Sequence, residues 1–154
     1  MNVGAINETD YGNYYMYGMG SKTYDNTDTP YAGTEDPLDS SVDTAAQELG
    51  GDWHMPTRAQ MQELTANTTY QWVTDYKGSG VNGGLFTATN GKSVFFPAAG
   101  YWLSGSQNYV GSDGYCWGSS PNGSRACYLY FNGGGEVVSS ISRKNGYSVR
   151  GVIG

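Results

Sequence analysis

Few side chains in this 154-residue sequence are spaced in a way that would support catalysis or metal binding. His54 is the only histidine, which excludes a multi-histidine metal centre and a second imidazole for proton relay. No G-x-S-x-G motif indicates a serine nucleophile, so a structural or exposed role is favoured for His54. The acidic stretch 22–39 lacks the spacing of an EF-hand calcium loop and is interpreted as a solvated loop. We therefore predict no enzyme activity, no cofactor and no metal site.

The two cysteines, Cys116 and Cys127, are the remaining reactive side chains. They fall on neighbouring predicted strands, so a cross-strand disulfide between them is geometrically conceivable. They can equally be free thiols or small apolar contacts, and the sequence leaves this choice open. No CxxC pair or Cys/His cluster indicates a zinc site.

The C-terminal third has a composition that is typical of a binding surface. Ser, Gly, Tyr and Asn make up 31 of the 54 residues of 101–154. Tyrosine gives large rigid contacts at low entropic cost, and the small polar residues give adaptable hydrogen bonds. The alternative interpretation is that Gly, Ser and Asn fill the turns of hairpins. Clustering with Trp102 and Trp117 favours the binding interpretation.

Charge and overall composition exclude several classes of protein. The formal net charge is −6, which disfavours nucleic-acid binding because phosphate contacts need clustered Lys and Arg. Residues 1–100 hold 4 basic and 12 acidic side chains, whereas 101–154 hold 4 and 2, so the two parts are expected to have different roles. Only 14% of residues are charged and 38% are hydrophobic, which argues against a coiled coil, a disordered chain and a membrane span. A single domain, 1–154, fits this length.

Two helices are predicted in the first half of the chain. A Ser-x-x-Asp pattern followed by TAAQEL and two glycines predicts a helix over 41–49. Thr57 and Gln60 form a capping-box pattern ahead of Met61 and Leu64, which predicts a second helix over 58–66. A strand is also expected near 14–18, and 22–39 is expected to be an extended loop.

From residue 70 onward the pattern changes to alternation with period two. The runs TYQWVTDY, LFTAT and KSVFFPA predict strands, and Asn90-Gly91 between the last two predicts a hairpin with a type I′ turn. Further strands are predicted over 115–119, 126–131, 136–141 and 147–153. Because helices come first and strands last, the order predicts an α+β domain with one small antiparallel sheet and long loops.

Seven strings along the chain, in this order, resemble those of a known family: NVGA, DYGNYYMYG, LGGDWHMPTRAQMQEL, SVFFPAAGYW, GSDGYCWGSSP, ACYLYF and NGYSVRGV. On these strings the sequence resembles the C-type lectin-like domains of Bacteroidetes and Fibrobacter paralogous surface proteins, and within them the variable proteins of diversity-generating retroelements. The resemblance implies a C-type lectin-like fold, with 1–100 as scaffold and 101–154 as a variable binding face. The motifs E-P-N, Q-P-D and W-N-D, through which calcium-dependent lectins of this fold bind sugar, are absent, which disfavours calcium-mediated sugar binding.

The same resemblance divides the C-terminal residues into framework and ligand contacts. Positions that match the family strings are interpreted as fixed framework: Tyr101, Trp117, Tyr128, Tyr130, Phe131, Arg143, Gly146, Val149 and Arg150. Positions that depart from them are predicted to contact ligand: Trp102, Leu103, Ser104, Ser106, Asn108, Tyr109, Cys116, Gly118, Asn122, Ser124, Arg125, Cys127, Glu136, Val138, Ser139, Ser140, Ser142 and Lys144.

Three functional hypotheses follow from these residues and the resemblance. The leading one is a non-enzymatic receptor-binding module, diversified by a retroelement and displayed outside the cell on a cell surface or virion, with an unknown protein or glycan receptor. The second is a calcium-independent carbohydrate-binding adhesin domain, and the third is an enzyme. The N-terminus lacks the basic and apolar regions of a signal peptide, so export is expected to be independent of one, or the chain to be trimmed.

Overall fold

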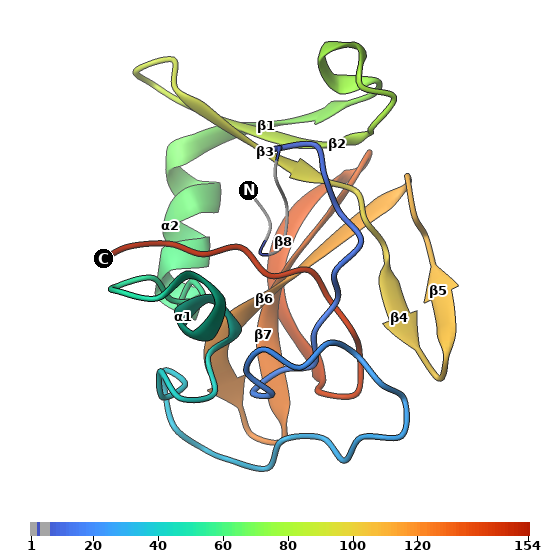
Figure 1. Ribbon diagram of the computed structural model, residues 1–154. Coiled ribbons are helices and arrows are strands. Elements are labelled where there is room, and N and C mark those ends of the chain that lie inside the picture. Colours follow the sequence, from blue (N-terminus) through green and yellow to red (C-terminus); the bar gives the residue numbers. More distant parts are fainter. Residues whose placement is uncertain (1–2, 4–6) are drawn as a thin grey trace.

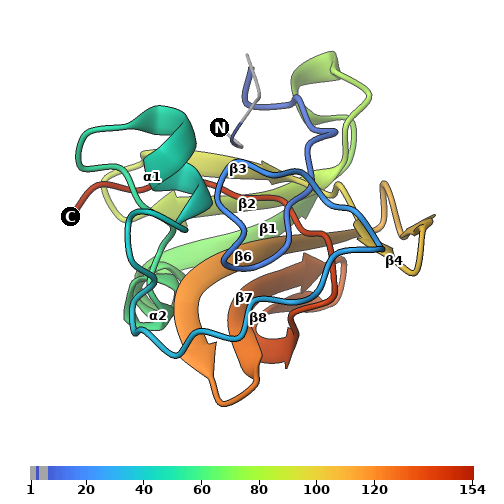
Figure 2. The same ribbon diagram turned by 60° about the horizontal axis from the view of Figure 1, so that its bottom comes forward.

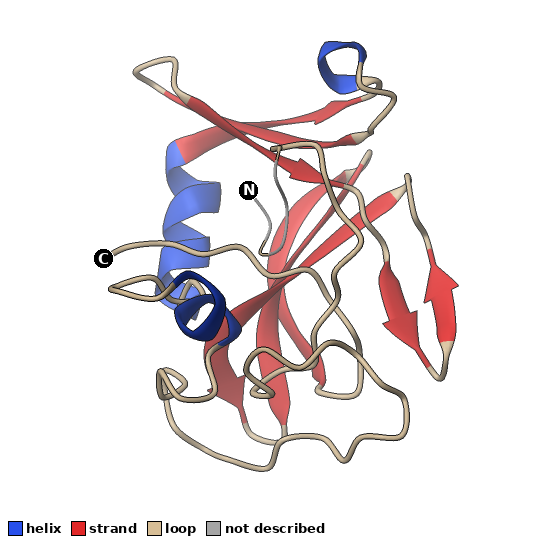
Figure 3. Cartoon of the chain, viewed as in Figure 1, coloured by secondary structure: helices blue, strands red, loops and turns tan. Residues whose placement is uncertain are grey.

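Small antiparallel sheets dominate the computed structural model, which describes Val3 and residues 7–154 (Figures 1 and 3). Within these residues, the strand order is β1-β2-β3 in one sheet, β4-β5 in a hairpin and β6-β7-β8 in the central sheet. The elements are α1 (Thr44–Leu49), α2 (Arg58–Asn67), β1 (Thr68–Val73), the 3-10 turn η1 (Tyr76–Gly78), β2 (Gly83–Ala88), β3 (Ser93–Pro97), β4 (Tyr101–Leu103), β5 (Ser106–Asn108), β6 (Asp113–Asn122), β7 (Arg125–Asn132) and β8 (Gly135–Ser142).

The predicted fold class is therefore wrong. An α+β domain of C-type lectin-like fold, with two helices on one small antiparallel sheet, was expected. The described residues instead form three antiparallel sheets, and the two α-helices have only 6 and 10 residues. The β-patterned half does not join into one sheet. After Pro97 the chain forms the β4–β5 hairpin, whose one β-bridge to a later segment, within the described residues, is the isolated bridge of Trp102 with Gly146.

Both predicted helices exist, and their caps explain their limits. The Thr57 hydroxyl accepts from the Gln60 amide, and the Gln60 side chain accepts from the Thr57 amide, which confirms the capping box of α2. α1 begins three residues later than predicted, because its N-cap is Asp43 and not a serine. The buried Asp43 carboxylate accepts from the amides of Ala46 and Met55, so it joins α1 to the segment before α2.

The strand predictions are confirmed in part. The hairpin between β2 and β3 is present, but Asn90 does not have the positive φ that a type I′ turn needs, whereas Gly91 does. The stretches predicted near 14–18 and over 147–153 form only isolated bridges, such as Tyr15 with Tyr147. The segment 22–39 is a loop that crosses one end of the molecule, as expected.

The central sheet separates two hydrophobic cores. On one face, Trp117 and Ala126 pack with Tyr17, Tyr147 and Val149, which come from segments near the two ends of the chain. The second core includes Cys116, Cys127, Leu129 and Phe131, together with Met61 of α2, Phe86 of β2 and Phe96 of β3. Alternate residues of β6 and β7 thus serve opposite cores, as the period-two geometry of a strand requires. Figure 2 shows α2 beside the central sheet, where its Met61 packs into the second core.

The buried Arg143 fixes the acidic loop against the central sheet. Its guanidinium lies over the Tyr17 ring, 4.7 Å from the ring centroid, and all of its hydrogen bonds with the described residues go to backbone carbonyls. These carbonyls come from both the loop and the β6–β7 turn, which supports a framework role for this residue. They belong to Tyr31, Gly33, Gly123 and Arg125, at 2.8, 2.8, 3.1 and 3.2 Å.

Candidate binding face

Five partly exposed tyrosines gather on one side of the central sheet and the β4–β5 hairpin. The register pairs Tyr115 with Tyr130, and Trp117 with Tyr128, so these side chains share one face of the sheet. Tyr101 of β4 joins them, and Tyr109 follows β5 with its ring 60% exposed. We call the five side chains the tyrosine face: Tyr101, Tyr109, Tyr115, Tyr128 and Tyr130.

Ring contacts make the tyrosine face a continuous surface. The centroids of Tyr101 and Tyr109 lie 6.0 Å apart, those of Tyr101 and Tyr115 4.9 Å, and those of Tyr115 and Tyr130 5.0 Å. Tyr128 lies 6.2 Å from Tyr115. Beneath them the buried Tyr147 ring lies 5.0 Å from Tyr115, so the exposed rings rest on a packed aromatic layer.

The Asp113 carboxylate accepts hydrogen bonds from two hydroxyl groups of the tyrosine face. Asp113 accepts from the Tyr130 hydroxyl at 2.7 Å and from the Tyr115 hydroxyl at 3.4 Å. The pKa of Tyr115 is raised by burial and by the charge of Asp113, and that of Tyr130 is raised first by its hydrogen bond to Asp113. Both hydroxyls are therefore neutral at physiological pH. The face offers uncharged aromatic area with hydrogen-bonding edges.

Several predicted contact residues lie around this face. Asn108 pairs with Tyr101, and Leu103 with Ser106, so alternation places all three on the hairpin side that carries Tyr101. Ser139 is exposed and pairs with Tyr128 in the register of β7 and β8. With Tyr109, these residues make up the part of the predicted set that the structure brings together.

Trp102 points to the opposite side of the β4–β5 hairpin. Its ring lies 6.4 Å from that of Tyr14 and 6.2 Å from that of Tyr24, and it is only partly exposed. A groove of about 600 Å³ surrounds it, lined also by Lys22, Asp25 and other residues of the acidic loop. Trp102 is thus available to a ligand, but in a different place from Tyr109.

The cysteines and Gly118 do not fit the predicted contact role. Cys116 and Cys127 are buried free thiols on the far side of the central sheet, so they are not exterior contacts and they form no disulfide. The register explains this, because Cys116 pairs with Leu129 and Cys127 with Ser140. Gly118 is also buried, and a Cβ there would lie 2.4 Å from the methyl group of Met61.

The other predicted contacts are dispersed. Glu136, Val138 and Ser140 pair with Phe131, Leu129 and Cys127, so they face away from the tyrosines. The remaining residues lie at the edges of the sheet or in turns: Ser104 in the β4–β5 turn, Asn122, Ser124 and Arg125 at the β6–β7 turn, Ser142 at the end of β8 and Lys144 after it.

Residue-by-residue prediction missed the centre of the face. Tyr115 was assigned to neither group, and Tyr101, Tyr128 and Tyr130 were assigned to the fixed framework. Val110 and Val137 were not assigned either, although their side chains are 42% and 49% exposed. The signal was present in the period-two spacing of Tyr115 and Trp117 in β6 and of Tyr128 and Tyr130 in β7.

The described residues contain no group of three or more His, Cys, Asp or Glu side chains that could hold a metal ion. His54 lies in an isolated bridge with Val152, and its Nδ1 is 2.6 Å from the Met55 carbonyl oxygen, which is a structural environment. Among the helices described, none has both the length and the apolar character needed to cross a membrane.

Comparison with protein families gives a match over the part of the chain that carries the tyrosine face. A family model described as "Domain of unknown function (DUF8237)" matches residues 72–152, which is more than half of the sequence and includes β2 to β8. Comparisons with curated proteins and with solved structures found no match. The chain therefore belongs to the family Domain of unknown function (DUF8237).

Proposed function

We propose that this protein is a non-enzymatic ligand-binding module that binds a protein receptor through the tyrosine face. The observation that supports it is the continuous surface of five tyrosines on ordered strands and a short hairpin. Display on a cell surface or virion, with retroelement-driven variation of exposed positions, is part of the same proposal.

The physical basis is that little entropy is lost when such a surface binds. The rings of Tyr101, Tyr115 and Tyr130 already pack against one another, so their rotamers are restricted before a ligand arrives. Tyr109 is the most exposed ring and is held at a positive φ of 58°, next to the exposed Val110. Aromatic anchors with small polar neighbours such as Ser139 are typical of antibody-like surfaces.

A display library tests the proposed surface. Randomising Tyr109, Val110, Val137 and Ser139 and selecting against lysozyme, as an arbitrary protein target, should yield binders whose affinity falls when Tyr115 or Tyr128 is changed to Ala. A matched library at the exposed residues Glu48, Gln62, Thr89 and Lys92 should not. Equal enrichment from both libraries would contradict the proposal.

Natural diversification is tested separately at the gene. We expect a reverse-transcriptase gene nearby and an adenine-rich repeat that is nearly identical to the segment encoding the C-terminal residues. Sequencing related isolates should show variation concentrated at exposed positions around the face. Uniform variation along the chain would contradict the retroelement part and leave the binding surface intact.

A second candidate function is calcium-independent carbohydrate binding in the Trp102 groove. The observation in its favour is the aromatic pair Trp102 and Tyr24 in a groove that also carries Asn13, Asp25 and Asn26. Aromatic rings with short polar side chains suit the apolar and hydroxyl faces of a sugar. A glycan array with and without chelator tests it, and Trp102→Ala should remove any binding while Tyr109→Ala leaves it unchanged.

A further inference from the structure

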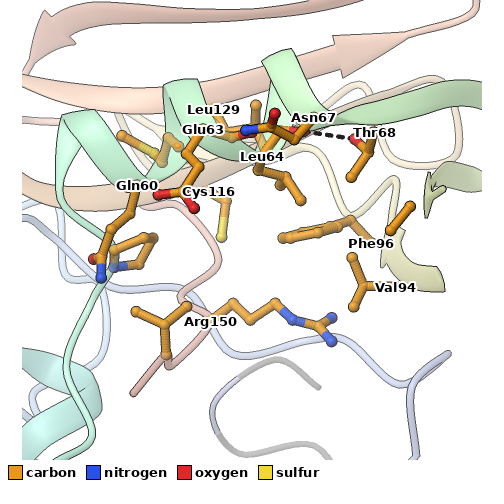
Figure 4. Close-up of a pocket in the computed structure, with 14 residues that line it drawn as sticks. Gln60, Glu63, Leu64, Asn67, Thr68, Val94, Phe96, Cys116, Leu129 and Arg150 are labelled. Atoms are coloured by element: carbon orange, nitrogen blue, oxygen red, sulfur yellow. Dashed lines mark hydrogen bonds between the residues drawn. The ribbon is translucent and has the colours of Figure 1, made fainter. Parts of the chain in front are cut away.

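A second concavity lies on the other face of the central sheet. It is a cavity of about 410 Å³ that is open to solvent on one side and is bordered by α2, by β3, by the central sheet and by the segment that follows β8 (Figure 4). This volume falls within the range of about 300–1,000 Å³ that is usual for small-molecule sites. It lies away from both the tyrosine face and the Trp102 groove, because its sheet residues Cys116 and Leu129 point to the opposite face.

The walls of this cavity are mostly apolar, although they also include Gln60, Glu63, Asn67 and Thr68. Met61 and Leu64 of α2 face Phe96 of β3, and Cys116 and Leu129 close the side formed by the central sheet. Burial raises the pKa of the Cys116 thiol to about 11, so this thiol is neutral and serves as part of the wall. Such walls suit the hydrocarbon part of a ligand.

One cation interrupts the apolar lining. The Arg150 guanidinium lies over the Phe96 ring, 4.6 Å from its centroid, and Nη1 donates to the Phe95 carbonyl at 2.9 Å. Within the described residues, no carboxylate lies within ion-pair distance of Arg150, and Nε and Nη2 have no acceptor. Burial lowers the pKa of Arg150, although the charge of Glu8 opposes this. Arg150 thus retains hydrogen-bond donors that an anion could use.

We propose that this cavity binds a small monocarboxylic acid with an apolar body. The carboxylate accepts from the free donors of Arg150, and the body lies among Met61, Leu64 and Phe96. Arginine donors recognise carboxylates through charge-assisted hydrogen bonds, which are stronger than neutral ones. The site is independent of the tyrosine face and would serve as a second binding function.

Glu63 limits the ligand to a single negative charge. This exposed residue of α2 lines the same cavity, across from Arg150 in Figure 4. Its carboxylate disfavours a second anionic group on the ligand because like charges that face each other repel, and this repulsion is strongest at low salt since Glu63 is exposed. A dicarboxylate or a phosphate is therefore expected to bind less well than a monocarboxylate.

Calorimetric titration with two matched probes tests the proposal. The probes are 3-phenylpropionate and its neutral analogue 3-phenylpropanamide, which share one apolar body. We expect the acid to bind about tenfold more tightly than the amide, which corresponds to about 1.4 kcal/mol. Equal binding of the two would overturn the role of Arg150, and no binding of either at millimolar concentration would overturn the site.

Three variants sharpen the test. Arg150→Met keeps an apolar stem over Phe96 and should lower the affinity for the acid to that for the amide. Arg150→Lys should retain part of the difference in affinity between the two probes. Glu63→Gln should raise the affinity for the acid and leave the affinity for the amide unchanged. Val94→Phe fills the cavity and should abolish binding of both probes.

Each variant also has an outcome that contradicts the site. An acid that binds Glu63→Gln no more tightly than the parent would show that it does not lie in this cavity, and unchanged binding to Val94→Phe would show the same. These two variants decide the matter even where a variant at Arg150 fails to fold. Tyr109→Ala, on the far side of the sheet, is the control and should change neither affinity.

Discussion

The two faces of the β6–β7–β8 sheet come from the same strands but have opposite chemistry. On one face, Tyr115 and Tyr130 are partly exposed, and their hydroxyls are bonded to Asp113. On the other, Cys116 and Leu129 are buried beneath α2 and the β1–β3 sheet and line a mostly apolar cavity. A shift of one residue in the register would exchange the two sets. Strand alternation therefore gives one small sheet a partly exposed tyrosine face and a buried apolar face, each of which is a candidate binding surface.

The faces also differ in what covers them. The apolar face is covered by α2 and by β2, which bring Met61 and Phe86 into its core. The tyrosine face is covered only at one end, where Trp117 and Tyr147 pack with segments near the chain ends, and it is open toward Tyr109. The tyrosine face is exposed because no other segment packs over most of it, and residue type matters less.

The largest effect is expected when a buried anchor is removed from either face. Trp117 and Phe131 are 0% and 1% exposed and lie on opposite sides of the sheet. Trp117→Ala or Phe131→Ala should each lower the free energy of unfolding by roughly 3 to 5 kcal/mol, because a large cavity is left. Urea denaturation measures this loss, with Tyr109→Ala as the control. Stable protein from either variant would show that its face is not anchored in a core.

Sequence reasoning found the local elements better than their assembly. The capping box at Thr57 and the hairpin at Gly91 depend on neighbouring residues, and both are present. The prediction of the fold class was wrong because the fold depends on which strands pair across long distances in the sequence. The β-patterned half divides into separate sheets. The isolated bridge of Tyr15 with Tyr147 is such a long-range pairing, and nothing in either local sequence predicts it.

The candidate site was predicted only in outline. The composition of the C-terminal residues indicated a tyrosine-rich surface. Tyr109 is exposed and Ser139 pairs with Tyr128, so both lie beside the tyrosine face, and their role as contacts stays a prediction. Cys116 and Gly118 were predicted as contacts but are buried, because a comparison of strings does not show which way a strand residue points. Because side chains alternate along a strand, every second residue from Trp117 lies on the same side of the sheet as Trp117. This rule would have separated the tyrosines from the residues of the apolar face.

Alkaline pH should weaken the tyrosine side. Burial raises the pKa of Tyr147 above the ordinary value of about 10, so the folded state keeps a proton that the unfolded chain loses. Stability is then complete below that value and falls above it, by about 1.4 kcal/mol per pH unit for each such tyrosine. Tyrosinate absorbance and tryptophan fluorescence should change together. Titration of all tyrosines near the ordinary pKa, with fluorescence unchanged, would mean that the cluster is solvated.

A smaller effect is expected from the hydroxyl network. Tyr130→Phe removes the 2.7 Å hydrogen bond to Asp113 and leaves that carboxylate with the longer one from Tyr115. It also removes the 2.9 Å hydrogen bond that the Tyr130 hydroxyl accepts from Asn132. The expected loss of stability is about 0.5 to 1.5 kcal/mol for each of the two bonds removed. Tyr109→Phe is the matched control, since its ring is 60% exposed. Equal melting temperatures for the two variants would show that Asp113 does not order the face.

The smallest effect is expected from the exposed rim, where the proposed display role requires tolerance. Ser106, Tyr109, Ser139 and Lys144 are exposed, and Leu103 is partly exposed at the tip of the hairpin. Substitutions at surface sites usually change stability by no more than about 0.5 kcal/mol each, since no core contact or buried hydrogen bond is lost. Simultaneous replacement of all five should therefore leave one cooperative thermal transition close to that of the parent. Loss of cooperativity would mean that these residues hold the hairpin against the sheet, and the tyrosine face would then be a structural layer rather than a surface free to vary.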